Sequence, residues 1–331
     1  MADLTTSYLG LDLRAPIIAS CSPLTGHEDS LLQLAEAGAG AVVLPSLFQE
    51  EAEAEELAAS DLMDTGDAFA EFASAPLSEI EFTEIGPARH IDRLRRAKEL
   101  VDIPVLASVN GSRVGDWARY AQMLAEAGAA AIELTLFSVN TDPDESSADV
   151  EARYLQIIES VRGRIAVPLA VKLSQHITGL SSFARRIQEA GADGLVLFNR
   201  FYGAEVDLDS LTLESRLALS SPDELRFPLR WIGILRAQRP GLSLAATSGV
   251  HSGLDAAKAL LVGADVACTT SAVLQHGPGY LAVMLRELDA WLDEHDYESV
   301  RQLRGSMSAA NVPDPGQFER AQYMKVVTSS L

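Results

Sequence analysis

The feature that most constrains the fold is a joint that recurs four times along the chain. In each copy an amphipathic stretch ends at a Gly and a buried, strand-like run follows: EAGAGAVVL at 36–44, EAGAAAIEL at 126–134, EAGADGLVL at 189–197 and LVGADVACT at 261–269. A Gly at the end of a helix takes the left-handed C′ position, and the small and β-branched residues after it favour a strand. The chain therefore alternates helix and strand over nearly its whole length.

Eight short apolar runs are predicted to be strands: 16–22, 41–46, 104–111, 131–138, 168–174, 194–199, 243–249 and 265–271. Runs that are apolar on both faces are typical of a parallel sheet covered by helices. Eight such units in about 270 residues favour an α/β fold of the closed (β/α)8 TIM-barrel type, with a doubly wound open sheet as the alternative. The connections 47–103 and 200–242 are too long for simple crossovers, so we expect insertions after the second and sixth strands.

Composition excludes several classes of function. The net charge of −21 argues against a nucleic-acid or anionic-membrane partner, because both rely on Lys and Arg to neutralise phosphate. The start, MADLTTSYLG, lacks the basic and apolar parts of a signal peptide, and no run of 18 apolar residues occurs. We expect a soluble, cytoplasmic protein.

No metal site is predicted. Cys21 and Cys268 fall inside apolar runs and are expected to be buried thiols. The acidic stretch EEAEAEEL at 50–57 is predicted to be a solvated helix face rather than a cation site. We expect one barrel domain over 1–305 and a C-terminal extension over 306–331, which would cap the barrel or bind a second subunit of a homodimer.

Polar residues gather where the predicted strands end. In a (β/α)8 barrel the C-terminal ends of the strands form the open mouth that carries function. A single polar residue there would only satisfy backbone groups, but such residues at nearly every strand indicate a large polar ligand. They include Ser20, Ser46, Asn110, Thr135, Ser138, Asn140, Lys172, Asn199, Arg200, Thr247, Ser248, Thr270 and Ser271.

Lys172 is the most informative single residue. It interrupts the apolar run LAVKLS, and a lysine that points into a barrel needs a partner because a lone buried ammonium is strongly unfavourable. An anionic or electron-rich ligand would supply that partner. The alternatives are a lysine that snorkels to solvent, or one that pairs with a carboxylate such as Glu133 on the neighbouring strand.

The segment 247–281 indicates a phosphate site. A turn at Ser248 and Gly249 precedes a helix predicted to begin near Ser252, and a turn at Thr270 and Ser271 precedes a helix predicted after Gly277. Helix N-termini after strands seven and eight are the usual barrel phosphate site. Ordinary turn chemistry would explain the same glycines.

With these motifs the chain resembles the dihydroorotate dehydrogenase family, and most closely its class 1 members and their dehydrogenase-like relatives. The resemblance covers residues ~5–305 through LGLDLRAPIIASCS, IELTLFSVN, LAVKLS, GLVLFN and LAATSGVHSGLDAAKALLVGADVACTTSAVLQHGP. It implies a TIM-barrel flavoprotein with FMN across the mouth, a small anionic substrate and a role in pyrimidine biosynthesis.

The resemblance also implies roles for single residues. Lys172 would contact the isoalloxazine ring and stabilise negative charge on it, and Ser138 would be the catalytic base in the position that a Cys or Ser fills in the family. Asn140, Asn199 and Arg200 would bind substrate. The remaining cofactor contacts would come from Ala19, Ser20, Asn110, Thr247, Ser248, Gly249, Thr270 and Ser271.

The chain departs from the family mainly on the substrate side. Pro45 stands where members carry a Lys for the orotate carboxylate, and Thr135 stands where the base motif begins with Asn. Arg200 would replace the lost Lys, since a guanidinium suits a carboxylate, or it is a surface arginine. We therefore expect an FMN-dependent oxidoreductase acting on dihydroorotate or a related small dihydro-acid. The alternatives are a flavin-binding protein with an altered or lost orotate site and a non-flavin lyase or isomerase using Lys172.

Overall fold

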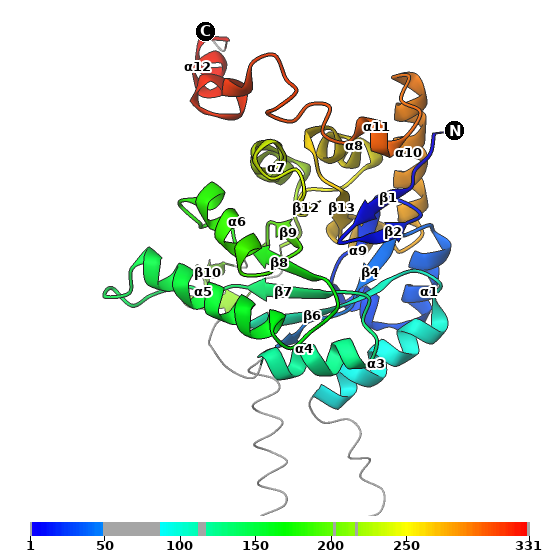
Figure 1. Cartoon of the computed structure of the whole chain (residues 1–331), viewed down its shortest axis with the longest axis vertical. Coiled ribbons are helices and arrows are strands. Elements are labelled where there is room, and N and C mark those ends of the chain that lie inside the picture. Colours follow the sequence, from blue (N-terminus) through cyan, green and yellow to red (C-terminus); the bar gives the residue numbers. More distant parts are fainter. Residues whose placement is uncertain (1, 49–86, 112–116, 201–202, 216–217, 330–331) are drawn as a thin grey trace, which may run out of the picture.

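The structure is a computed structural model that describes residues 2–48, 87–111, 117–200, 203–215 and 218–329 (Figure 1). Eight parallel strands form a closed barrel, because they pair in the order β4-β3-β13-β12-β9-β8-β7-β6 and β6 pairs again with β4. Each lies inside its predicted run, so the barrel is confirmed and the open sheet is wrong. The strands are β3 Ile17–Ala19, β4 Ala41–Val43, β6 Val105–Gly111, β7 Ile132–Leu136, β8 Leu169–Leu173, β9 Gly194–Leu197, β12 Ser243–Ala246 and β13 Val266–Thr269.

Helices surround this barrel on its outside (Figure 1). The four repeated joints are confirmed, since Gly38, Gly128, Gly191 and Gly263 all have positive φ, between 98° and 120°. The main helices are α1 Glu28–Glu36, α3 Pro87–Leu100, α4 Trp117–Glu126, α5 Ser147–Arg162, α6 Leu180–Glu189, α7 Arg226–Gln238, α8 Gly253–Val262 and α10 Tyr280–Glu294.

A short antiparallel hairpin, which the sequence analysis missed, packs against the interior of the barrel. It consists of β1 Thr6–Tyr8 and β2 Leu11–Leu13, joined at Leu9 and Gly10 with φ of 54° and 75°. Two successive positive φ values are typical of the tight type I′ hairpin turn. Tyr8, Leu9 and Leu13 join the apolar cluster of inward-facing strand residues, which includes Ile18, Val43, Leu106, Val196 and Val266. The hairpin thus fills the barrel at the end away from its mouth.

The two predicted insertions have different outcomes. After the second strand, β5 Leu47–Phe48 pairs with β6, while 49–86, with the acidic stretch 50–57, lies outside the described residues. After the sixth strand comes a hairpin of β10 Ala204–Asp207 and β11 Thr212–Ser215, followed by the short helix η3 Pro222–Leu225.

The C-terminal extension continues from α11 Val300–Leu303 into η4 Pro315–Phe318 and α12 Arg320–Ser329. Figure 1 shows α12 at the edge of the molecule, beyond α7 and away from the barrel strands. Phe318 packs closely against Gly233 of α7, where an added Cβ would lie 2.4 Å from its ring. The domain boundary at 305 and the homodimer stay predictions. Among the described helices, none has the length and apolar character needed to cross a membrane.

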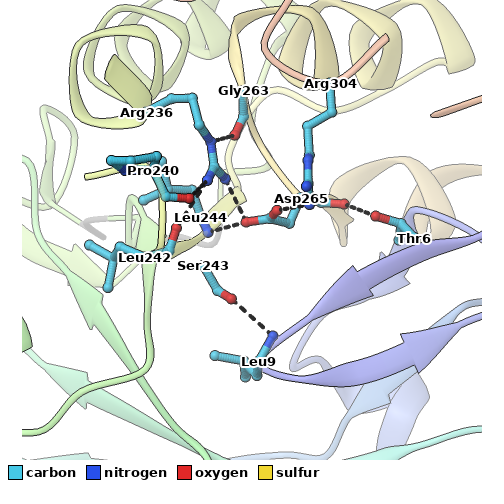
Figure 2. Close-up of polar contacts among 10 residues, drawn as sticks. All are labelled: Thr6, Leu9, Arg236, Pro240, Leu242, Ser243, Leu244, Gly263, Asp265 and Arg304. Atoms are coloured by element: carbon cyan, nitrogen blue, oxygen red, sulfur yellow. Dashed lines mark hydrogen bonds and ion pairs between the residues drawn. The ribbon is translucent and has the colours of Figure 1, made fainter. Parts of the chain in front are cut away.

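A buried ion-pair network at the start of β13 ties distant segments together (Figure 2). The carboxylate of Asp265 accepts a hydrogen bond from the backbone N–H of Leu244 at 2.6 Å and pairs with Arg236 at 2.7 Å and with Arg304. The Thr6 hydroxyl donates to the backbone carbonyl of Asp265 at 3.0 Å. Asp265 therefore joins α7, β12 and the segment after α11 through its carboxylate, and the N-terminal hairpin through its backbone carbonyl.

We predict that Asp265→Asn lowers the free energy of unfolding by about 3 kcal/mol, because it leaves two guanidinium groups without their buried carboxylate. Urea unfolding followed by tryptophan fluorescence measures the loss. Asp102→Asn is the matched control: Asp102 pairs with Arg14 at 3.4 Å, but its side chain is 83% exposed, so its loss should cost less than about 1 kcal/mol. Equal losses in the two variants would contradict the account.

Candidate active site

A cavity of about 500 Å³ opens at the C-terminal ends of the barrel strands. This size is within the range of small-molecule and cofactor sites. Ten of the predicted site residues line it: Ser20, Asn110, Lys172, Asn199, Arg200, Thr247, Ser248, Gly249, Thr270 and Ser271. Three do not. Ala19 is fully buried with its side chain among the outward-facing core residues, and Ser138 and Asn140 line a different cavity.

The alternation of strand residues explains which side chains reach the interior. In β7, Ile132 and Leu134 belong to the core between barrel and helices, whereas Ala131 belongs to the interior cluster. Successive side chains point to opposite faces of a strand, so Glu133 and Thr135 point inward above Ala131. Lys172 follows the inward-facing Ala170 in the same way in β8, and the two strands are in register with Thr135 beside Lys172.

Lys172 and Glu133 form a buried ion pair at the base of the cavity. The Nζ of Lys172 lies 3.2 Å from Oε1 of Glu133, and the two side chains are 10% and 2% exposed. Burial by itself lowers the pKa of Lys172, but the Glu133 carboxylate outweighs it with help from Cys21 and Cys268, and the pKa lies above its ordinary value of 10.5. Lys172 is thus an ammonium. It pairs with Glu133, as one of the alternatives drawn from the sequence predicted, and it also faces the cavity.

Both cysteines are free thiols that line the cavity, in different surroundings. Cys268 is buried as predicted, and burial raises the pKa of its thiol to about 12. Cys21 is only half-buried, and its Sγ lies 3.5 Å from Oγ of Ser46, which is hydrogen-bonded to Ser108 at 2.7 Å.

Beside Cys21, the Ser22 hydroxyl is buried, lines the same cavity and makes no hydrogen bond to the described residues. Most buried polar groups have a partner, so a buried hydroxyl without one suits a ligand atom.

The predicted phosphate end has the conformation that a close backbone approach requires. Ser248 and Gly249 have φ of 70° and 82°, and a Cβ on Gly249 would lie 2.4 Å from the backbone N of Leu225. The helix predicted near Ser252 is confirmed as α8, with Ser252 capping its N-terminus. The short helix α9 Ser271–His276 was not predicted; it begins directly at the Thr270 turn and precedes α10.

Ser220 is a site residue that the sequence analysis missed. It comes from the insertion after the sixth strand and lines the cavity beside Ser271. Its backbone N–H and its hydroxyl both donate to Oγ of Ser271, at 3.0 and 2.8 Å. Ser220 is one of two adjacent serines in the run ALSSPDEL, and no local signal distinguished it from Ser221.

Ser138 and Asn140 lie together, in a second cavity of about 720 Å³. Thr135 and Phe137 line the main cavity, so Ser138, one residue on, points to the other side of the chain. Its hydroxyl donates to Oδ1 of Asn140 at 3.0 Å and lies 2.8 Å from the hydroxyl of Tyr154 on α5. Tyr154 is the polar neighbour that a serine base would need. It was not predicted because it lies 16 residues from Ser138 in the sequence.

Arg200 lines the main cavity but is already ion-paired. Its Nε lies 3.1 Å from Oε2 of Glu224, and its Nη2 donates to the carbonyl of Leu219 at 3.1 Å. Both partners lie in the insertion after the sixth strand. Arg200 is therefore neither a simple surface arginine nor a guanidinium held open for a ligand.

Comparison with known proteins decides the family. The family model described as "Dihydroorotate dehydrogenase" matches residues 79–292, more than half of the chain. The chain belongs to the dihydroorotate dehydrogenase family. The catalytic subunit of dihydroorotate dehydrogenase B (NAD(+)) from Thermoplasma acidophilum is 23% identical over 317 residues, covering 92% of this chain and 99% of that protein.

Two further relatives agree. The corresponding catalytic subunit from Endomicrobium trichonymphae is 26% identical over 312 residues, 92% of this chain and 97% of that protein. Dihydroorotate dehydrogenase A (fumarate) from Lacticaseibacillus paracasei is 30% identical over 194 residues, and this match spans 53% of the chain and 62% of the relative. The family name confirms the resemblance drawn from the motifs.

We predict that iodoacetamide alkylates Cys21 and leaves Cys268 unmodified in the folded protein at about pH 8. The thiolate is the reactive form, and with its pKa at about 12 the buried Cys268 remains a thiol. Peptide mass spectrometry after timed labelling separates the two sites. Urea-unfolded protein, in which both should react, is the control, and equal rates in the folded protein would contradict the placement of Cys268.

Proposed function

We propose that this protein is an FMN-dependent oxidoreductase of the dihydroorotate dehydrogenase type, which oxidises a CH–CH bond of dihydroorotate or a related small dihydro-acid. The observation that carries the proposal is the Lys172 ammonium, which faces the cavity from its base. A fixed buried cation stabilises a ligand that gains negative charge during reaction, as a flavin does on reduction.

The residues present fit FMN. The cavity has room for a large polar ligand, the Ser22 hydroxyl, which has no partner among the described residues, provides a hydrogen-bonding group, and the positive-φ turn at Ser248 and Gly249 lines the cavity. Ser248, Gly249, Thr270 and Ser271 would hold the phosphate at one end. Ser20, Asn110 and Lys172 would meet the ring system at the other, with Thr247 between them.

Bound FMN would supply the hydride acceptor for the reaction. Lys172 would then hold its proton, because its pair with Glu133 keeps it cationic, and would offset the charge that develops beside it. The walls of the cavity would orient the substrate and exclude water around it.

Ser138 remains the proposed proton acceptor. Its hydroxyl donates to Asn140, so Tyr154 supplies the proton in the bond between Tyr154 and Ser138, and the serine lies between two polar groups. Because Ser138 points away from the main cavity, the loop after β7 would have to turn for it to reach a substrate there. We include that movement in the proposal.

The substrate itself is proposed only as a small anion. Pro45 and Thr135 line the cavity at positions where the family resemblance places a Lys and an Asn, so recognition of orotate is altered. Asn199 and Arg200 would contact the anion. To do so, Arg200 would exchange part of its contact with Glu224 for a contact with the substrate. We place the activity in the cytoplasm.

The Schiff-base version of the alternative, a non-flavin lyase or isomerase, is disfavoured by one observation. A Schiff base requires a neutral amine, whereas the pKa of Lys172 is raised above its ordinary value by Glu133. We therefore propose no second function for the cavity.

The proposal predicts a yellow protein whose flavin absorbance is bleached under anaerobic conditions by dihydroorotate or by one member of a panel of small dihydro-acids. Ser138→Ala should slow the bleaching about 10²- to 10⁴-fold, the range for loss of a general base. Cys21→Ser, which changes a residue inside the main cavity, is the matched control and should bleach at the wild-type rate.

Each outcome of this experiment has a defined meaning. Unimpaired bleaching in Ser138→Ala would overturn the base, and slow bleaching in Cys21→Ser alone would move the base to Cys21. A yellow protein that no substrate bleaches would favour the altered or lost active site, and a colourless protein that takes up no FMN would overturn the function.

A further inference from the structure

A chain of three hydrogen-bonded side chains closes the predicted phosphate end of the cavity. Nε2 of His251 lies 3.0 Å from Oγ of Ser220, and Oγ of Ser220 donates to Oγ of Ser271 at 2.8 Å. Ser220 and Ser271 are both buried and line the cavity, whereas the half-buried His251 lies behind them. These three side chains connect the turn after β12, the insertion after β9 and the start of α9.

The direction of each hydrogen bond follows from counting protons. The single hydroxyl proton of Ser220 goes to Ser271, so the proton in the His251–Ser220 bond must come from Nε2 of His251. Oγ of Ser271 accepts from both the backbone N–H and the hydroxyl of Ser220, which fills its acceptor capacity. The hydroxyl proton of Ser271 is therefore left for a further acceptor. Every donor in this series of hydrogen bonds points from His251 toward the cavity.

We infer that His251 is a positioning residue for the phosphate of the cofactor: through Ser220 it orients the Ser271 hydroxyl toward that phosphate, and its protonation strengthens phosphate binding. The inference rests on the proposed function. It assigns roles to His251 and Ser220, neither of which was among the predicted site residues, and it makes flavin affinity dependent on pH.

Several neighbouring groups act on the pKa of His251. Burial lowers it below the ordinary value of 6.5, Asp255, a backbone hydrogen bond with Ser220 and Glu224 oppose this shift, and His276 adds to it. Asp255 also accepts from the backbone N–H of His251 at 3.2 Å, and on its other side it pairs with Lys258 at 3.0 Å.

These charges fix the sign of the pH effect. Without a ligand His251 is mainly neutral at neutral pH, because its pKa is lowered. A phosphate of charge −1.5 to −2 at the end of the chain favours the imidazolium and raises that pKa. FMN binding should therefore take up a proton, and affinity should rise as pH falls.

The test compares FMN with riboflavin, which lacks the phosphate, by fluorescence titration of the flavin-free full chain at about pH 8 and about pH 6. Between these values the affinity ratio of FMN to riboflavin should rise severalfold more in the wild type than in His251→Gln, whose side-chain amide still donates to Ser220 but cannot become charged. Ionisation of the FMN phosphate itself is common to both proteins and cancels. Ser220→Ala should weaken FMN about tenfold and leave riboflavin unchanged.

A second measurement counts protons directly. Calorimetric titrations with FMN in two buffers of different ionisation enthalpy should show more proton uptake at about pH 7 in the wild type than in His251→Gln, because the ionisation of the phosphate is common to both proteins. The inference is overturned if wild type and His251→Gln have the same pH dependence, or if they take up the same number of protons on binding FMN. Failure of the wild type to bind either flavin overturns the proposed function itself.

Discussion

The buried pair of Lys172 and Glu133 is the interaction on which the rest of the site depends. An ammonium inside a barrel is strongly unfavourable unless a carboxylate accompanies it, and removing one partner of such a pair typically costs about 3–5 kcal/mol. Glu133 is 2% exposed and points inward from the neighbouring strand, so the pair is fixed by the barrel itself and not by a mobile loop. It divides the interior into an apolar lower part and a polar mouth.

The lower part explains why the mouth can remain open. The hairpin carrying Tyr8 and Leu13 packs into the far end of the barrel against small and β-branched residues, and the Asp265 network anchors it. Stability is thereby supplied at the end of the barrel opposite the cavity. The strand ends at the mouth are then available for polar side chains such as Asn110, Asn199 and Thr247.

Most of the fold was predictable because it depends on local signals. Gly stops followed by apolar runs located four of the barrel strands, short apolar runs located the other four, and the ends of those strands located ten cavity residues. The hairpin at residues 6–13 was missed because strands of three residues carry too little alternation to be recognised. Ser220 and Tyr154 were missed for a different reason, since each reaches its partner from a segment that only the tertiary fold brings close.

The loop after β7 shows where motif and geometry diverge. The family resemblance predicts Ser138 as the base, but Phe137 lines the main cavity and Ser138 is hydrogen-bonded to Tyr154 instead. The sequence supports the type of reaction there, and the structure adds the requirement that the loop rearrange. The side of the cavity proposed to bind FMN needs no such change, since Lys172, Gly249 and Ser271 already line it.

The central claim is that this cavity binds a flavin over Lys172. An experimental structure of the full chain with FMN tests it most directly. The account predicts flavin density in the cavity, with Nζ of Lys172 within hydrogen-bonding distance of the ring system and the phosphate beside Gly249 and Ser271. Flavin bound elsewhere, or a cavity that remains empty at saturating FMN, would contradict it.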